Sequence, residues 1–432
     1  MSPGLALFLV SPAAAITWVV DPDGGGDAVT LEEGIALLSD YDTLEVREGV
    51  YAEGELRVSA EHVTIRGEGW ETTVIDGATY GLGVGLYLGS GRLEGISVRN
   101  FVDPGAVNYG GGDYPTVTTD ALLEVVDCAF IDSGFGVATS YSGALSVQRS
   151  RFYGNTWGII VYHAIGELWV QDSVFVGLNE RPAIANDPLE EDDFGPFGEL
   201  VVISNNLFIA GDVNISASEP YYAMSGPITY LLNNQFTGIY DGVNIGELVT
   251  GVVAGNVMGA ELGTTLDIDS PDVRAFHNTS GDPDFYAWSD DGDWSNDDFR
   301  LRAGSPGVDQ GVTGFDHLLT TLDLAGNTRP QDGDGDGTAL PDAGPYERLP
   351  DAVDPERTDD TGTSADSGTT TTDSGADGGG GDGGSGDDGG AVIGVDEDDR
   401  RRCGCGSKGQ GAMVGLLVWG LGVRRRRGSS MR

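Results

Sequence analysis

The chain has 432 residues, with 69 Asp or Glu against 23 Lys or Arg, so its formal net charge at pH 7 is −46. Such an acidic surface repels nucleic acid and anionic membranes, and it suits solubility and divalent cations, so we expect no nucleic-acid partner. Three cysteines exclude a disulfide framework, and the length permits either two or three ordinary domains or one continuous solenoid.

The first 15 residues predict an export signal. Gly4 to Val10 form an apolar run, and Ala13 to Ala15 provide a small-residue cleavage site. A basic stretch before the apolar run is missing, so the alternatives are a different start codon or a plain apolar N-terminus. We expect residues 1–15 to be a signal peptide and the protein to be exported to the outer surface or the extracellular space.

Residues 16–77 predict an N-terminal cap followed by the first strands. Apolar residues at helical spacing predict a short amphipathic helix over 31–38, with Thr30 as its N-cap and Glu33 at the reciprocal position. Strands are expected at 43–46, 56–58 and 63–65. A helix here would cover the apolar end and the unpaired strand edge of a solenoid.

This opening stretch resembles that of pectin-lyase-like β-helix proteins. The resemblance lies in Asp21 to Asp27, Asp42 to Val46, Gly49-Val50-Tyr51 and Gly67-Glu68-Gly69. It implies the fold but little about activity, because functions differ widely among proteins that share a fold.

The central residues, 78–281, carry a repeated pattern of a small polar residue, any residue and a bulky apolar residue. It occurs at Cys128-x-Phe130, Ser150-x-Phe152, Ser173-x-Phe175, Asn206-x-Phe208, Asn234-x-Phe236, Asn256-x-Met258 and Asn278-x-Ser280. The successive steps are 22, 23, 33, 28, 22 and 22 residues, and a period near 22 accommodates three short strands with their turns. The sequence therefore predicts an all-β fold, a right-handed parallel β-helix with a short N-terminal capping helix and a disordered C-terminal tail.

Stacked repeats place equivalent side chains in columns. We expect the phenylalanines of the pattern to point inward and lie over one another. The asparagines are expected to form a ladder in which each amide bonds the amide or backbone of the next rung.

Longer steps of 29, 33 and 28 residues, the first counted from Arg99-x-Phe101 to Cys128-x-Phe130, mark three insertions, at 103–119, 180–198 and 216–227. Solenoids carry binding surfaces on such loops, and aromatic rings beside carboxylates suit sugar rings. Insertions whose aromatics pack back onto the coil are the alternative. The candidate ligand-binding residues, with a polysaccharide or surface matrix as partner, are Tyr109, Tyr114, Glu190, Glu191, Asp192, Asp193, Tyr221 and Tyr222.

Two enzyme classes provide the rival hypothesis. The opening is also similar to that of pectin methylesterases, but the catalytic motifs of that family are absent, and Asp132 to Gly136 match one of them poorly. A polysaccharide lyase needs a base beside acids that bind calcium, and Arg149 and Arg151 lie one repeat from Asp127 and Asp172. A lyase or hydrolase acting on a polyuronate-like polymer is thus the alternative to a non-catalytic protein, and we assign no catalytic residue.

Residues 282–350 resemble the closing segment of bacterial secreted β-helix proteins, which implies that they finish the last rungs. Within them, Asp332, Asp334 and Asp336 have the spacing of a calcium loop, with a glycine at the sixth position. The twelfth position holds Ala343, one residue after Asp342. We predict either a structural calcium ion bound by Asp332, Asp334, Asp336 and Asp342 or a solvated acidic turn.

The C-terminal part divides into a stalk and a tag. Residues 351–399 are mostly Asp, Gly, Ser and Thr, so we expect a disordered, extended stalk. Residues 400–432 combine two cysteines, an apolar run at 412–423 that is too short to span a bilayer, and flanking arginines. This tag resembles the MYXO-CTERM-type sorting tag of myxobacterial surface proteins, which implies attachment through Cys403 or Cys405 and membrane contact only through the tag. A peripheral basic hairpin is the alternative.

Overall fold

The structure of the protein is a computed structural model. It describes residues 14–78, 83–102, 104–109, 122–140, 144–161, 166–177, 183–186, 200–209, 213–215, 227–238, 242–247, 249–259, 266–289 and 293–355. The predicted signal peptide, the stalk beyond residue 355 and the tag with Cys403 and Cys405 lie outside these residues. None of the described helices is long and apolar enough to cross a membrane.

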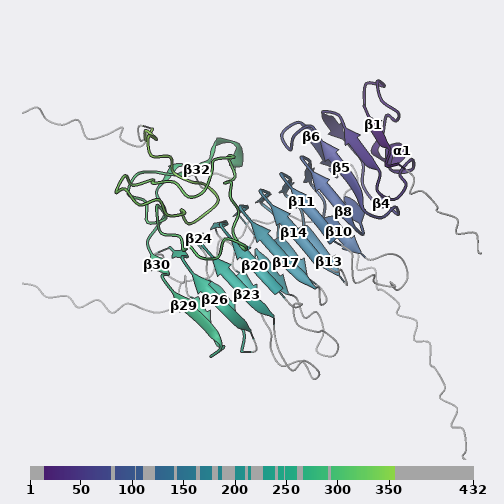
Figure 1. Cartoon of the computed structure of the whole chain (residues 1–432). Helices are drawn as coiled ribbons and strands as arrows, with labels where there is room; N and C mark the ends of the chain where they lie inside the picture. Colours follow the sequence, from purple (N-terminus) through teal and green to yellow (C-terminus); the bar gives the residue numbers. More distant parts are fainter. Residues whose placement is uncertain are drawn as a thin grey trace, which may run out of the picture. The chain divides into compact units, whose positions relative to one another are not determined.

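Three parallel sheets make up the body of the protein (Figure 1). Sheet A contains, in spatial order, β1 (Thr17–Val20), β2 (Thr43–Val46), β5 (Val63–Gly67), β8 (Gly91–Glu94), β11 (Leu122–Val126), β14 (Ala144–Gln148), β17 (Glu167–Gln171), β20 (Leu200–Ser204), β23 (Ile228–Leu232), β26 (Thr250–Ala254) and β29 (Val273–Phe276).

Sheet B contains β3 (Gly49–Tyr51), β6 (Thr73–Asp76), β9 (Ser97–Arg99), β12 (Ala129–Ile131), β15 (Arg151–Tyr153), β18 (Val174–Val176), β21 (Leu207–Ile209), β24 (Gln235–Thr237), β27 (Val257–Met258) and β30 (Thr279–Ser280). Sheet C contains β4 (Leu56–Val58), β7 (Leu86–Leu88), β10 (Pro104–Tyr109), β13 (Phe135–Ser140), β16 (Trp157–Val161), β19 (Ile184–Asn186), β22 (Val213–Ile215), β25 (Val243–Ile245) and β28 (Leu266–Ile268).

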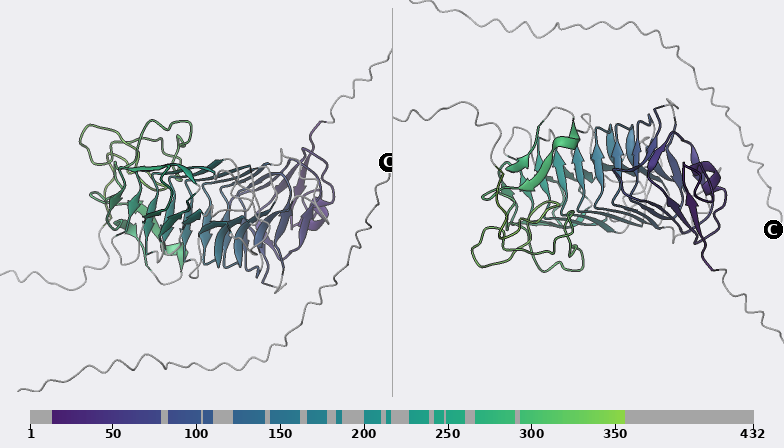
Figure 2. Two further views of the ribbon diagram at one scale, coloured as in Figure 1. Left: turned by 90° about the horizontal axis from the view of Figure 1, so that it is seen from below. Right: turned by 90° about the horizontal axis from the view of Figure 1, so that it is seen from above.

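Each central rung takes one strand from sheet A, one from sheet B and one from sheet C before the chain returns to sheet A. Every strand pairs in parallel with the equivalent strand of the next rung, as β11 does with β14. The predicted right-handed parallel β-helix is thereby confirmed, and Figure 2 shows its rungs stacked from the N-terminal end to the C-terminal end. Because each rung contacts only its neighbours, the repeat period of the sequence is enough to predict how most of these strands stack.

The predicted capping helix is present as α1 (Leu31–Ile35), three residues shorter than expected. The Glu33 backbone N–H donates to Thr30 Oγ1 at 3.2 Å, and the Glu33 carboxylate accepts from the Thr30 backbone N–H, so the predicted reciprocal cap forms. Leu31 is buried against the first rungs, in one cluster with Val20 and Leu44. The helix therefore covers the apolar end of the coil.

The phenylalanine column lies inside sheet B. Phe130, Phe152, Phe175, Phe208 and Phe236 are all fully buried. Their ring centroids are separated by 5.2, 4.5, 5.0 and 4.8 Å in turn, and the interplanar angles are 17° or less. The rings follow the strand spacing of about 4.8 Å, so the parallel register, rather than a preference of the rings themselves, sets their stacked geometry.

The asparagine ladder runs beside this column, at the turn from sheet A to sheet B. The Asn206 backbone N–H donates to Asn234 Oδ1 at 2.9 Å, and Asn234 donates in the same way to Asn256 at 3.0 Å. Each side-chain amide also donates to a carbonyl of the preceding rung, as Asn234 Nδ2 does to Ile203 O at 2.9 Å. The predicted ladder is therefore confirmed, and it satisfies backbone groups that a two-residue turn would otherwise bury without partners.

The C-terminal segment, residues 282–355, differs from the expectation that it finishes the last rungs. Its strands β31 (Phe285–Ala287) and β32 (Asp298–Leu301) form a separate antiparallel pair, with a 3-10 turn, η1 (Trp294–Asn296), between them. The segment instead folds back along the outside of the coil, beside the later rungs (Figures 1 and 2). Outward-facing apolar residues of sheets A and B provide the surface that it covers, which explains why it packs there.

Candidate functional site

The three predicted insertions leave the coil at the same corner. The ranges 103–119 and 180–198 include strands β10 and β19, and the residues after β10, β19 and β22 connect these strands to β11, β20 and β23. Each of these three connections runs from sheet C to sheet A. Sheet A places β20 beside β23, and β11 lies three strands away from β20, which is about 14 Å at the usual strand spacing. The topology thus gives the insertions a common edge that the sequence spacing alone did not provide.

The predicted ligand-binding residues on these insertions fall almost entirely outside the described part of the chain. Tyr109 ends strand β10, and the structure describes its backbone only. The other seven lie outside the described residues: Tyr114, Glu190, Glu191, Asp192, Asp193, Tyr221 and Tyr222. The strands on either side of them nevertheless locate the corner from which they leave.

Three residues of the lyase hypothesis occupy the turn column between sheets A and B, where Asp127, Arg149 and Asp172 have positive φ angles of 52°, 47° and 48° in turn. Arg149 makes a bidentate pair with Asp127, from Nε to Oδ1 at 2.8 Å and from Nη2 to Oδ2 at 2.6 Å. This hydrogen bonding raises the pKa of Arg149 above its ordinary value. A guanidinium held in this way is a poor general base.

Asp172, one rung further, lies beneath the C-terminal segment. Its Oδ1 accepts from Arg329 Nη2 at 3.3 Å, and both side chains are almost completely buried. Burial raises the pKa of Asp172 to about 6, against the opposing effect of the Arg329 charge. Asp172 is therefore closed to a polymeric substrate, and the four residues of the lyase hypothesis do not form one open cluster.

Arg151, the remaining residue of that hypothesis, lies with its guanidinium 4.6 Å from the centre of the Trp70 ring. Its Nη1 also reaches the Arg149 carbonyl at 3.4 Å. These contacts suit a structural cation–π interaction.

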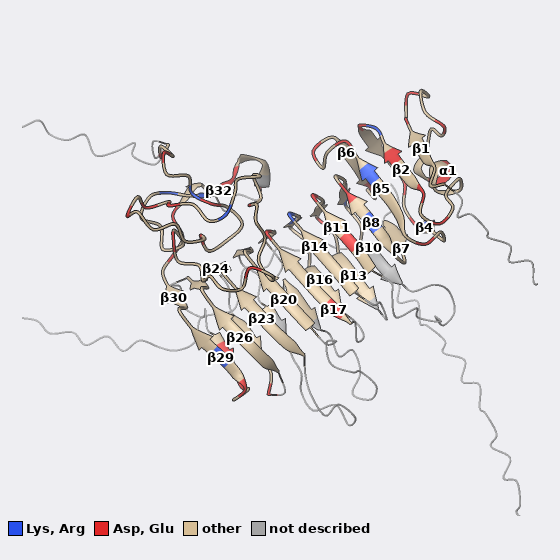
Figure 3. Ribbon diagram, viewed as in Figure 1, with Lys and Arg blue, Asp and Glu red and all other residues tan. Residues whose placement is uncertain are grey.

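The outer surface of sheet A carries little charge on its later rungs. Strands β20, β23 and β26 contain no acidic or basic residue, and Figure 3 shows these strands in tan. Their outward residues pack against Val312, Phe315, Leu318 and Leu319 of the C-terminal segment. This part of the coil is thus a packing surface, and these three strands offer no charged side chain to a ligand.

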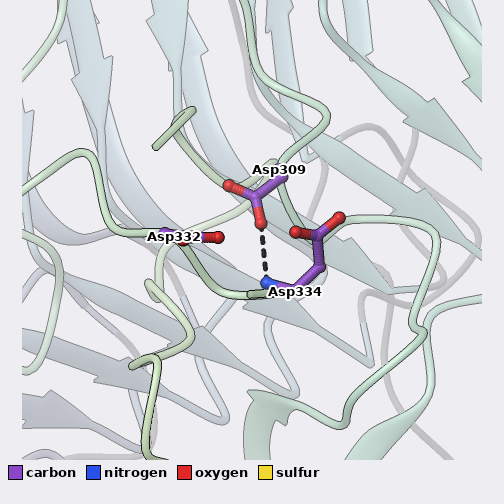
Figure 4. A group of neighbouring side chains, drawn as sticks. All are labelled: Asp309, Asp332 and Asp334. Carbon is purple, nitrogen blue, oxygen red and sulfur yellow. Dashed lines mark hydrogen bonds between the residues drawn. The ribbon is translucent and has the colours of Figure 1, made fainter. Parts of the chain in front are cut away.

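The acidic loop brings together Asp309, Asp332 and Asp334, with ligand oxygens within 4.8 Å of one another (Figure 4). Asp309 Oδ2 accepts from the Asp334 backbone N–H at 2.9 Å. The two oxygens of Asp332 accept from the backbone N–H groups of Gly335 and Gly337 at 2.9 and 3.1 Å. Both glycines have positive φ angles, which lets the chain turn tightly around the carboxylate.

Two of the four predicted calcium ligands lie in this group and two lie elsewhere. Asp336 is exposed, and its Oδ1 accepts from the Thr338 backbone N–H at 2.7 Å. Asp342 is fully buried, and its carboxylate accepts from the backbone N–H groups of Asp309 and Arg348. Burial and the nearby Glu347 charge raise the pKa of Asp342 to about 8. Asp342 therefore holds the backbone of Asp309 in place and is not itself in the carboxylate group.

Sequence reasoning missed Asp309. It lies 23 residues before Asp332, outside the spacing of a calcium loop. Burial, with the nearby Asp334 charge, raises the pKa of Asp309, as expected for carboxylates gathered without a cation. Three clustered carboxylates fit a hard divalent cation, whose remaining ligands would be water or carbonyl oxygens.

Comparison with known proteins gives neighbours of low similarity. No family model matches the chain, and no curated protein matches it. Among solved structures, the pectate lyase Pel9A is similar, with 13% identity and a TM-score of 0.42, over 78% of this chain and 97% of that chain. The pectin methylesterase PemA from Erwinia chrysanthemi has 15% identity and a TM-score of 0.29, over 64% and 91%. Pectin methylesterase from carrot has 15% identity and a TM-score of 0.30, over 63% and 83%. At these values the likeness concerns the parallel β-helix fold, which the sheet topology establishes independently.

Proposed function

We propose that the protein is an exported, non-catalytic β-helix that binds glycan or extracellular matrix through its three insertions. The observation that carries this proposal is the common corner from which all three insertions leave the coil. Loops that project from one edge of a rigid scaffold can contact a single extended polymer together. Export through residues 1–15 and surface attachment through Cys403 or Cys405 belong to the same proposal.

The arrangement of charged groups supports a binding role over polyuronate cleavage. Arg149 is neutralised by Asp127, and Asp172 is covered by the C-terminal segment. A lyase would need an accessible base beside acids that hold a cation at the sugar carboxylate. The described residues of the lyase hypothesis do not meet this requirement.

We expect the double variant Tyr221→Ala/Tyr222→Ala to weaken glycan binding about tenfold, which corresponds to about 1.4 kcal/mol of lost stacking. Isothermal titration against neutral polysaccharides, polygalacturonate and alginate would identify the ligand and then measure the loss. Tyr41→Ala is the matched control, because Tyr41 is an exposed tyrosine at the N-terminal end of the coil. Calcium-dependent release of unsaturated uronates by the unaltered protein would overturn the proposal in favour of a lyase, and equal binding by both variants would remove the loops from it.

A structural calcium ion is a second part of the proposal. We infer that Asp309, Asp332 and Asp334 hold it, on the basis of their convergence in the acidic loop. The ion would neutralise three carboxylates and fix the loop against the rest of the C-terminal segment. It would have no part in a reaction.

We expect the protein to melt at a higher temperature in calcium than in a chelator. At a calcium concentration a hundred times the dissociation constant, the free energy of unfolding should rise by about 2.7 kcal/mol. Asp334→Asn should abolish this shift, and Asp336→Asn should preserve it. The two variants are matched, since Oδ1 of Asp334 accepts from the Asp336 backbone N–H and Oδ1 of Asp336 accepts from that of Thr338. Differential scanning calorimetry measures the calcium-dependent shift of the melting temperature in each variant. An equal loss in the two variants would contradict the inferred ligand set.

A further inference from the structure

A second candidate binding site lies in the C-terminal segment, apart from the three insertions. Strand β31 and the chain on either side of it line a pocket of about 420 Å³. This volume is within the range of small-molecule sites and is sufficient for one sugar ring with its solvent. The side chains that matter to the argument are Asp284, Trp288, Ser289, Asn296, Asp297 and Arg302.

The walls of the pocket are fixed before any ligand binds. Behind them, Phe285 and Phe299 are buried and pack edge to face with ring centroids 5.6 Å apart. The Ser289 backbone N–H donates to Asp297 Oδ1 at 2.9 Å, which ties the two sides of the pocket together. Little ordering is therefore required on binding, which favours affinity.

Trp288 supplies an apolar platform. Phe285 holds its indole in an edge-to-face contact at 6.4 Å, and 43% of the residue remains exposed. Tyr286 is less suitable, because the guanidinium groups of Arg300 and Arg302 lie 4.9 and 5.8 Å from the centre of its ring. An exposed indole at a mostly polar pocket is the arrangement that binds the C–H face of a pyranose.

Arg302 shapes the pocket but is poorly placed to bind an anion. Its guanidinium donates to the carbonyls of Phe285, Tyr286 and Pro355, at 2.9, 2.7 and 2.6 Å. It also lies 3.7 Å from a carboxylate oxygen of Asp284. The positive charge is thus engaged by backbone carbonyls and an acid, and it stabilises the pocket wall.

The remaining polar groups favour a ligand that donates hydrogen bonds. Asp284 presents carboxylate oxygens, which can accept several hydrogen bonds, and Ser289 and Asn296 add a hydroxyl and an amide. Asp297 contributes its negative charge to the pocket wall, while its Oδ1 accepts from Ser289 and its Oδ2 is buried. Sugar hydroxyls satisfy such acceptors. A uronate would bring its own carboxylate against two others, and like charges at close range cost binding energy.

We propose that this pocket binds one uncharged pyranose ring of a neutral glycan, with the ring stacked on Trp288 and its hydroxyls donating to Asp284. The site is independent of the insertions. It also selects against the polyuronates that the lyase hypothesis would require.

Isothermal titration of the full chain with cellotetraose, mannotetraose, trigalacturonate and a glucosamine trimer tests the proposal. We expect a neutral tetrasaccharide to bind, trigalacturonate to show no measurable binding, and Trp288→Ala to weaken the neutral ligand by tenfold or more. Tyr41→Ala should leave binding unchanged, and an unaltered melting temperature of Trp288→Ala would show that the segment stays folded. Asp297→Asn retains an acceptor for the Ser289 backbone N–H, so it should reduce the discrimination against trigalacturonate.

Three results would overturn the proposal: no binding of either neutral tetrasaccharide, unchanged affinity in Trp288→Ala, or preference for the charged trisaccharides. The Tyr221→Ala/Tyr222→Ala variant separates the two sites. If the insertions bind glycan and the pocket does not, this variant binds about tenfold more weakly and Trp288→Ala binds as the unaltered protein does. If only the pocket binds, the Tyr221→Ala/Tyr222→Ala variant loses none.

Discussion

We expect Asn234→Ala to lower the free energy of unfolding by about 3 kcal/mol, although the substitution removes only a small polar side chain. Asn234 is fully buried in the middle of the ladder. Its Oδ1 accepts from the Asn206 backbone N–H at 2.9 Å and from Asn206 Nδ2 at 3.0 Å. Its Nδ2 donates to Ile203 O at 2.9 Å and to Asn256 Oδ1 at 3.0 Å. Alanine removes the side-chain partner of the buried Asn206 N–H and of the buried Ile203 carbonyl, and water cannot reach this position to replace the amide.

Urea denaturation followed by circular dichroism measures this loss. Asn278→Ala is the matched control, because Asn278 makes the same kinds of hydrogen bond at the end of the ladder but is only partly buried. Water can replace its amide, so we expect a loss of about 1 kcal/mol. Similar losses at the two positions would contradict the role that burial has in this prediction.

We expect Arg329→Met to destabilise the protein by about 3–5 kcal/mol at pH 8. Arg329 is 3% exposed and pairs with two buried carboxylates, Asp172 at 3.3 Å and Glu347 at 2.5 Å. Its guanidinium also donates to the Gly344 carbonyl at 2.8 Å. Methionine fills similar space but leaves both acids buried without their cation. The contact joins the C-terminal segment to the coil, so limited proteolysis should release the segment first.

Arg149→Met is the control for this experiment. Arg149 pairs with Asp127 on the same turn column, but both side chains are partly exposed, and we expect a cost below about 1 kcal/mol. Adding Asp172→Asn and Glu347→Gln to Arg329→Met should recover much of the lost stability, because the buried charges are then removed. Failure of this rescue would mean that Arg329 acts through packing and its carbonyl contacts.

The cost of Arg329→Met should also depend on pH. Burial already raises the pKa of Asp172 to about 6 in the folded protein, above its ordinary value near 4. The folded state therefore holds this proton more tightly than the unfolded chain, so the stability from Asp172 is fully present below about pH 4 and is lost as pH rises through about 6. Loss of Arg329 raises the pKa of Asp172 further. The variant should thus be least impaired near pH 4 and most impaired at pH 8, and urea denaturation across this range measures the trend. A penalty that does not vary with pH would contradict the explanation.

Much of the coil could be predicted from the sequence because its determinants are local and repeated. Thr30 and Glu33 identified the cap of α1 from their spacing alone, and the Ser/Asn-x-Phe pattern identified both columns of the core. In a solenoid each rung meets only its neighbours, so a regular period fixes which residues stack. The same reasoning located the insertions, whose extra residues interrupt the period.

Contacts between segments far apart in the chain could not be predicted from the repeat period. Asp172 meets Arg329 across 157 positions, and Asp309 joins an acidic loop whose motif begins 23 residues later. These contacts depend on where the C-terminal segment packs, and its path is set by complementary apolar surfaces rather than by a period. The sequence by itself determined the stacked coil, its cap and the positions of its insertions. Only the tertiary structure decided that the C-terminal segment folds back, that it covers Asp172, and that the insertions share one corner, because burial and proximity across such distances arise only when the whole chain is packed.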